Sequence, residues 1–445
     1  MKNYLFLFSS SAVILTLGIG MSLITSCEGP AGLRGEDGED GIDANETCKL
    51  CHNALVVGAK MVQYQLSKHS YGEVAFEEAG STGCTPCHGS EAFKYVSKNN
   101  TPSTFTLNAS SGNYSNDYAA TAETAMGHID CSTCHSSLHT TYDSTDFYPL
   151  TNTAAVSMTM WKGQKSIDLT QSNGESNLCV KCHQPRPLTT STSLSDGDVV
   201  DYAALVTSPN TIFYDSAVGN ASPNVLTPSY RTHVHYGSVG AVYAGQGGIE
   251  FPGTQTYESS THTSIASCQD CHMAPITGTA GGHTFNAKGN FKGCNAPGCH
   301  TSAITSSTAN LWTTPRAEIK TLLNSLATKI NVIGGGTEIL HREAGEDNLW
   351  AGLTTNNYDG YLNIYDPSSN PTGVWKNPAP SNSWTVDQKA TNNALDTFPS
   401  LKNVHIGTMV NFQLCLREYS LGIHNFKYTK ALLQNSIEAL TAAGY

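Results

Sequence analysis

The sequence predicts a mainly α-helical protein with extensive irregular loops and little β-structure. Hydrophobic residues make up 39% of the 445-residue chain, which is below the share in a typical globular domain. The segments 100–125 and 186–232 are rich in Ser, Thr, Asn and Gly, residues that favour turns and loops. Clear helical periodicity is found only near the C-terminus. A core made of side chains alone would therefore be small over most of the chain.

A short motif, Cys-x-x-Cys-His, recurs through the first two thirds of the sequence. Five copies have the regular spacing: Cys48, Cys51 and His52; Cys84, Cys87 and His88; Cys131, Cys134 and His135; Cys179, Cys182 and His183; Cys268, Cys271 and His272. A sixth copy, Cys294, Cys299 and His300, has four residues between its cysteines. This pattern is the attachment signature of c-type haem, in which two thiols bond to the porphyrin and the histidine is the proximal iron ligand. We therefore predict six covalently attached haem c groups.

A zinc ribbon, a disulfide framework and a thioredoxin-like redox site fit the motif less well than haem does. A zinc ribbon would need four ligands at each site, usually from paired Cys-x-x-Cys units. Neither a disulfide framework nor a thioredoxin-like site gives a reason for a histidine after every second cysteine. Six porphyrins would also supply the apolar surface that the composition lacks. The predicted fold is therefore haem-cored.

The charge balance limits the partners. The formal net charge is -12, and haem propionates would make it more negative. Nucleic acids attract basic surfaces, so the sequence argues against a nucleic-acid partner and fits cationic or neutral ones.

The N-terminus has the features of an export signal. Lys2 is followed by an apolar stretch and then by Ile24-Thr25-Ser26-Cys27, which resembles a bacterial lipobox. We predict a lipoprotein signal peptide over 1–26 and lipidation of Cys27. An ordinary signal peptide or a membrane-spanning helix is the alternative. Residues 27–45 carry glycine at every third position, as in collagen, but the run is short and a flexible tether is the simpler interpretation.

The haem-binding region is predicted over 46–310. Its motifs are unevenly spaced, which argues against a solenoid of equal repeats. Short strands are expected within Val199 to Val206 and Gly237 to Phe251.

The C-terminal region, 311–445, is predicted to be helical and to pack on the haem core. Thr314 and Pro315 suit the start of a helix, and Gly334 to Gly336 suit its end. An apolar stripe runs between them: Ile319, Leu322, Leu323, Leu326, Ile330 and Ile333. Residues 337–403 are expected to be irregular, and two further helices are expected at about 404–420 and 425–443. Cys415 is predicted to be a buried free thiol.

Ten histidines lie outside the motifs, enough to give each iron a second imidazole. The predicted distal ligands are His69, His128, His139, His262, His283 and His424, and His235 is a further candidate. His139 is four residues after His135, so in a helix both rings share a face and His139 would serve a neighbouring haem. Met273 is too close to His272 to cross the porphyrin, and Met158 and Met160 are expected to pack.

The sequence Ser420-Leu421-Gly422-Ile423-His424-Asn425-Phe426-Lys427-Tyr428, and the fifth motif followed by Gly282-His283, carry a family resemblance. They resemble bacterial multihaem c-type cytochromes of the nitrite reductase, hydroxylamine oxidoreductase and octahaem reductase superfamily. The resemblance implies a haem scaffold, an electron-transfer role and a ligand or site role for His424. Pentahaem nitrite reductases carry a lysine in place of the catalytic motif histidine, whereas every motif here ends in histidine. No mark of the crosslinked tyrosine of hydroxylamine oxidoreductases is found, so no catalytic residue is carried over.

The leading functional hypothesis is an electron-transfer cytochrome of the bacterial cell envelope, lipid-anchored to the outer membrane and facing the periplasm or the cell surface. Electrons would hop along bis-histidine haems, which have low potentials. Expected partners are other cytochromes, an extracellular acceptor and copies of the same chain. The alternative is a reductase of a small nitrogen or sulfur oxyanion or of a metal ion, with one open haem and with Arg231, Arg342 or Tyr358 near it. A third hypothesis is an adhesin that carries haem structurally.

Overall fold

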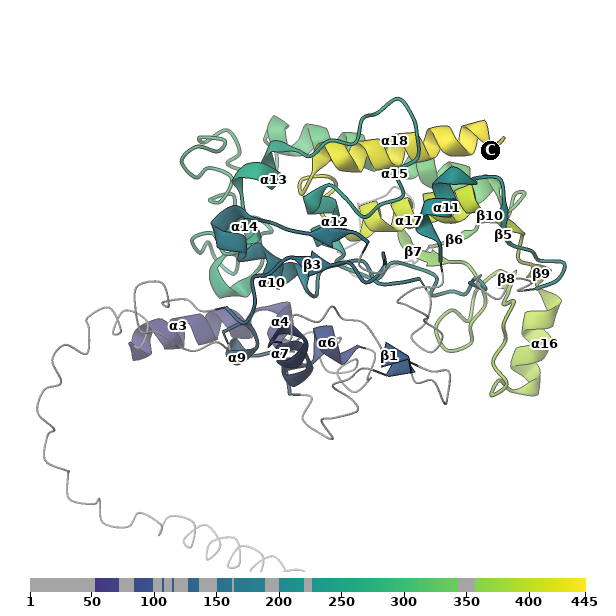
Figure 1. The fold of residues 1–445 in the computed structure, drawn as a ribbon, viewed down its shortest axis with the longest axis horizontal. Coiled ribbons are helices and arrows are strands. Elements are labelled where there is room, and N and C mark those ends of the chain that lie inside the picture. The colour runs from purple at the N-terminus through teal and green to yellow at the C-terminus, as the bar shows by residue number, and fades with distance from the viewer. Residues whose placement is uncertain are drawn as a thin grey trace, which may run out of the picture. The chain divides into compact units, whose positions relative to one another are not determined.

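The computed structural model describes residues 53–71, 84–98, 106–107, 114–115, 127–135, 150–161, 164–188, 200–219, 226–342 and 357–445. The chain divides into two compact units, Met1–Ala59 and Lys60–Tyr445. Helices contain 42% of the described residues and strands 9%, which confirms the mainly helical prediction (Figure 1). Cys27, the tether, the first motif and His139 lie outside the described residues.

Short helices carry the regular motifs that the structure describes. They are α6 (Thr85–His88), α9 (Cys131–Cys134), α10 (Ser176–Val180) and α14 (Cys268–His272). Capping boxes fix two of them: Asp130 accepts from the Thr133 amide at 3.0 Å, and Ser267 accepts from the Asp270 amide at 3.3 Å. Such caps satisfy amides that a helix start leaves unpaired. These caps hold the motifs of Cys131 and Cys268 as one turn of helix.

Three longer helices form the main apolar core at the C-terminal end of the chain. They are α15 (Asn310–Val332), α17 (Asn403–Arg417) and α18 (Phe426–Ala442), which pack side by side (Figure 1). The predicted stripe of α15 is buried at Ile319, Leu323, Leu326 and Ile330. Every residue of α17 is buried. The prediction of three helices in this region is confirmed, and so is a buried free thiol at Cys415.

The start of α15 differs from the prediction. The helix begins at Asn310 rather than near Pro315. The amides of Trp312 and Thr313 both donate to the Ala309 carbonyl at 2.9 Å, so a first turn forms before the proline. Pro315 then lies in the second turn of the helix, where it has no amide hydrogen to donate to the Leu311 carbonyl.

The two predicted strand segments contain helices instead. Residues Tyr202–Thr207 form α11 and Val239–Ala244 form α12. Asp201 caps α11 by accepting from the amides of Ala203 and Ala204, both at 3.1 Å. A cap of this kind stabilises a helix by about 1 kcal/mol, which outweighs the weak strand preference of a few valines.

The segment 337–403 is more regular than predicted. β6 (Leu340–Arg342) pairs antiparallel with β7 (Tyr358–Leu362), and β8 (Trp375–Lys376) pairs parallel with β9 (Asp396–Thr397). β10 (Leu401–Lys402) pairs with the distant β5 (Ile212–Tyr214). The helix α16 (Val386–Ala394) begins with a capping box between Thr385 and Gln388. A threonine followed three residues later by a glutamine is a sequence pattern typical of a helix start, and the prediction missed it.

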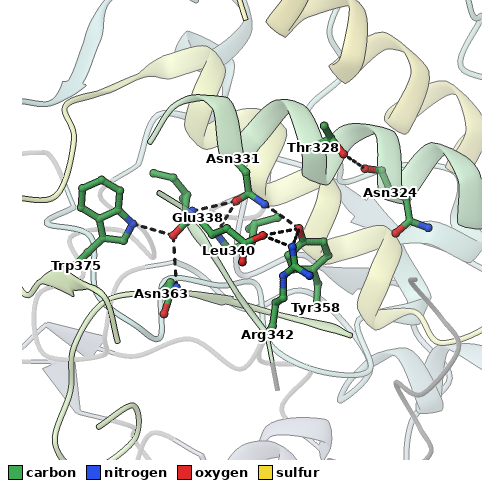
Figure 2. A network of polar contacts seen from close by, with 10 residues as sticks. Asn324, Thr328, Asn331, Glu338, Leu340, Arg342, Tyr358, Asn363 and Trp375 are labelled. Carbon is green, nitrogen blue, oxygen red and sulfur yellow. Dashed lines mark hydrogen bonds and ion pairs between the residues drawn. The ribbon is translucent and has the colours of Figure 1, made fainter. Parts of the chain in front are cut away.

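A polar network ties the end of α15 to β6 and β7 (Figure 2). The Asn331 amide donates to the Tyr358 hydroxyl at 2.8 Å, and Arg342 forms an ion pair with Glu338. The Trp375 indole donates to the Glu338 carbonyl at 2.8 Å. Arg342 and Tyr358, which the reductase hypothesis would place near an open haem, are thus engaged in holding this network together.

The remaining elements are short. They are α3 (Ala54–Gln65), α4 (Lys68–Tyr71), α7 (Ser90–Lys98), β1 (Thr106–Leu107), β2 (Tyr114–Ser115), β3 (Val156–Ser157), β4 (Ser166–Ile167), η2 (Gln171–Gly174), α13 (Thr261–Ile265) and η3 (Gly282–Thr284). β1 pairs with β2 and β3 with β4. None of the described helices has both the length and the apolarity needed to cross a membrane.

Replacing Phe412 with alanine is expected to lower the free energy of unfolding by about 3–5 kcal/mol, because a fully buried aromatic ring leaves a cavity. Phe412 is 0% exposed in the core of α15, α17 and α18. Denaturant unfolding followed by far-ultraviolet circular dichroism measures the change. Val386→Ala is the control, since Val386 is 83% exposed and its loss should cost under about 0.5 kcal/mol. Equal effects of the two variants would contradict this description of the core.

Candidate metal centres

Each of the five described motif histidines faces a histidine from outside the motifs. The ring centroids are 6.1 Å apart for His69 and His183, 6.1 Å for His88 and His235, 6.4 Å for His135 and His283, 5.8 Å for His262 and His300, and 6.2 Å for His272 and His424. Every pair joins one motif histidine to one other histidine. No two motif histidines share a pair among these five.

The separation suits a metal ion between the two rings. Two imidazole nitrogens that bind opposite sides of one metal, each at about 2 Å, lie about 4 Å apart and hold their ring centroids about 6 Å apart. In the pair His262 and His300 the two Nε2 atoms face each other at 3.5 Å. Ordinary aromatic packing also allows such distances, but it gives no reason for one pair at every described motif.

Most of the predicted distal histidines are members of these pairs. His69, His262, His283 and His424 each face a motif histidine, and so does His235. His128 is exposed and belongs to none of the five pairs. His52 and His139 lie outside the described residues.

Of the neighbouring residues His233 and His235, only His235 belongs to one of the five pairs. The amide of His235 donates to Nδ1 of His233 at 2.8 Å, while the His235 ring faces His88. His341 and His405 have other partners: His341 contacts Asp359 at 2.5 Å, and His405 accepts from the Lys402 amide at 3.1 Å.

Burial keeps several of these rings neutral. Desolvation lowers the pKa of His69 to about 4, of His283 to about 4 and of His235 to about 3. A metal binds the neutral imidazole, because its lone pair must be free. Among the described atoms, Nδ1 of His235 and Nδ1 of His283 are buried without a hydrogen-bond partner, which is rare for polar groups that the polypeptide alone must satisfy.

Main-chain carbonyls orient other rings of the pairs. Nδ1 of His183 donates to the Gly237 carbonyl at 3.1 Å, Nδ1 of His262 to the Ile423 carbonyl at 3.0 Å, and Nδ1 of His272 to the Phe285 carbonyl at 2.9 Å. A proton on Nδ1 leaves the Nε2 lone pair free for a metal, and in His262 this nitrogen faces Nε2 of His300. This is the usual second contact of a metal-bound histidine.

His424 has a carboxylate at the same position. Its Nδ1 lies 2.6 Å from Oε2 of Glu418, whose side chain is fully buried. Burial alone would lower the pKa of His424, but the hydrogen bond and charge of Glu418 raise it above its ordinary value. Sequence reasoning missed Glu418, because a glutamate six residues before a histidine has no characteristic spacing.

Backbone strain is concentrated near the histidine pairs. Positive φ angles occur at His235 (81°), Phe285 (53°), Tyr419 (61°) and Leu421 (55°). Such angles are costly for residues other than glycine and persist where surrounding structure enforces them. Each of these residues is a pair member, accepts a hydrogen bond from one, or lies in the loop before His424.

Among the described motifs, the motif of Cys179, Cys182 and His183 contacts two others. The Cys182 thiol contacts the Cys87 carbonyl at 3.7 Å. A hydrogen bond from the Cys179 thiol lowers the pKa of the Cys268 thiol to about 7. We call Cys179, Cys182 and His183 the central motif.

Phe285 connects three of the pairs. Its ring centroid lies 5.1 Å from that of His69 and 5.8 Å from that of His283, and its carbonyl accepts from His272. Three candidate centres therefore converge on one residue.

The methionines agree with the prediction that they pack. Met158 and Met160 are 0% exposed within apolar clusters. Within the described ranges no three or more His, Cys, Asp or Glu side chains gather as a metal site. No protein-family model, curated protein or solved structure matches this chain.

Proposed function

We propose that this protein is a multihaem c-type cytochrome that transfers electrons, with haem c bound at each of the six motifs. The observation that supports this most is the facing of every described motif histidine by a second histidine, at ring separations of 5.8 to 6.4 Å. Two thiols and two opposed imidazoles are the covalent and axial bonds that a bis-histidine haem c needs. The bound haem supplies one-electron iron chemistry.

The chain's own residues hold and separate these groups. The proposed ligand pairs are His69 with His183, His88 with His235, His135 with His283, His262 with His300, and His272 with His424. For His52 at the first motif, the candidates that stay open are His128 and His139. The contacts between motifs support electron hopping, because the thioether-forming cysteines of neighbouring sites lie within hydrogen-bond range of each other.

A second imidazole opposite each described motif histidine favours an electron carrier over a reductase. A reductase needs one iron face open to its substrate, whereas each of the five pairs would supply two imidazoles to one bound haem. We retain the relationship to the nitrite reductase, hydroxylamine oxidoreductase and octahaem reductase superfamily as part of the proposal, on the segment around His424 and on the fifth motif with Gly282-His283.

The place of the protein in the cell is proposed on the sequence alone. The lipobox at Cys27 supports an outer-membrane lipoprotein, and the negative charge supports cationic or neutral partners. Electrons would pass between other cytochromes and a periplasmic or extracellular acceptor.

Spin quantification tests the proposal. In the fully oxidised, purified protein, electron paramagnetic resonance should show low-spin iron that accounts for all of the haem measured by the pyridine haemochrome assay. Mass spectrometry should give six covalent haems. A high-spin signal from about one haem in six would overturn the carrier proposal and direct screening to nitrite, hydroxylamine and sulfur oxyanions. Absence of covalent haem would overturn the cofactor itself.

A further inference from the structure

We propose that Glu418 lowers the reduction potential of the haem held by His272 and His424, and that this haem is therefore a high-energy step within the electron path. This inference rests on the proposed function. It concerns one carboxylate that does not touch the haem iron but acts on it through the Nδ1 hydrogen of His424.

The geometry shows a carboxylate surrounded by donors. Glu418 is 0% exposed and accepts from the Ser420 hydroxyl at 2.5 Å, the Gly422 amide at 2.9 Å and His424 Nδ1 at 2.6 Å. Three donors and no acceptor among these contacts are what an ionised carboxylate requires. Glu418 is thus a buried anion held against the back of a ligand ring.

The loop between α17 and α18 fixes this arrangement. Tyr419, Leu421 and Gly422 all have positive φ angles, of 61°, 55° and 84°. A Cβ at Gly422 would also lie 2.8 Å from a side-chain carbon of Ile319, so glycine is required there. The loop therefore returns sharply and brings His424 back over the Glu418 carboxylate.

The chemistry follows from the charge of the acceptor. An N–H group bonded to a carboxylate makes the imidazole a more basic ligand than one bonded to a neutral carbonyl. A more basic ligand stabilises iron(III) relative to iron(II). A haem held by His272 and His424 would supply one-electron iron chemistry in which no bond is made or broken, and Glu418 would keep the proton on Nδ1 of His424.

Neighbouring sites have neutral acceptors at the described positions. His183 and His262 donate to carbonyls of Gly237 and Ile423. The His272–His424 site lies beside the central motif, because the Cys268 thiol is hydrogen-bonded to the Cys179 thiol, and on its other side Cys271 lies near Cys294. An electron that passes between the central motif and the motif of Cys294 therefore meets the Glu418-biased haem in between.

A potentiometric redox titration of the full-length holoprotein tests the inference with Glu418→Gln. Glutamine keeps the size and an acceptor oxygen but removes the charge. We expect one component, about one haem in six, to move to higher potential by about 59 mV, which is a tenfold change in the ratio of oxidised to reduced haem for a one-electron couple. The other components should stay in place.

Glu438→Gln is the matched control. Glu438 lies on α18, is partly exposed to solvent and accepts from the Thr254 hydroxyl at 2.6 Å, so its variant loses the same charge at the surface. Superposition of the Glu418→Gln titration on the wild type, or an equal shift in both variants, would overturn the inference.

A second variant covers a failure of Glu418→Gln to fold. Ser420→Ala keeps the charge of Glu418 and removes one competing donor, together with the acceptor of the His424 amide at 3.0 Å. The bond from the His424 ring to Glu418 should strengthen, and the same component should move to lower potential. No shift in this variant would count against the inference. Loss of covalent or low-spin haem in the wild type would instead contradict the proposed function, so the two failures are distinguishable.

Discussion

Replacing His424 with alanine is expected to convert about one haem in six from low spin to high spin. His424 faces His272 with the rings 6.2 Å apart and nearly parallel, at 12°. Removing it would leave one iron with a single protein ligand and an open face. Electron paramagnetic resonance of the oxidised protein, with spins quantified against haem, measures the change.

Two further variants define what the result means. His341→Ala removes a histidine that contacts Asp359 rather than a motif histidine, so its spectrum should stay fully low spin. His424→Met should keep six-coordinate low-spin iron and raise the potential of one haem, because thioether ligands favour iron(II). A low-spin His424→Ala protein with full haem content would show that His424 is not a ligand.

The double variant Cys179→Ala, Cys182→Ala is expected to divide the electron path. It removes the central motif, which contacts both the motif of Cys87 and the motif of Cys268. We expect one haem fewer by mass spectrometry. When the remaining haems are reduced in a stopped-flow experiment, their reduction should follow two kinetic phases instead of one. The reason is that the haem groups on either side lose their shared neighbour.

The matched control is Cys294→Ala, Cys299→Ala. It also removes one haem, but from a motif whose neighbour is Cys271 of the fifth motif. Its remaining haems should still reduce as one connected group. Two phases in both double variants, or in neither, would contradict the central position of the Cys179 and Cys182 site.

The features that could be predicted well from the sequence are those with local signals. The stripe from Ile319 to Ile330 marks α15 by its period and is buried in the structure, while the haem site that each Cys-x-x-Cys-His motif indicates within five residues stays a prediction. Both need no knowledge of distant residues. The ten histidines outside the motifs also indicated a special role, since their number is unusual for an ordinary core.

The features that could not be predicted depend on distant contacts or on competing local ones. His69 precedes its partner His183 by more than a hundred positions, and no spacing rule connects them. The cap at Asp201 favours a helix where the valines of Val199 to Val206 indicated a strand, and the cap at Thr385 favours a helix within 337–403, which was expected to be irregular. Glu418 contacts His424 only because the loop between them turns back sharply, and this turn requires Gly422 beside Ile319.

The position of Phe285 makes the segment Gly282 to Phe285 a mechanical junction. The Phe285 ring contacts the rings of His69 and His283, and its carbonyl accepts a hydrogen bond from His272. An insertion or deletion there would displace three centres together. The same change in a connecting loop would alter the conformation of that loop alone. The spacing of three of the six proposed haem sites therefore depends on one short stretch of backbone. Insertions and deletions are expected on either side of this stretch rather than within it.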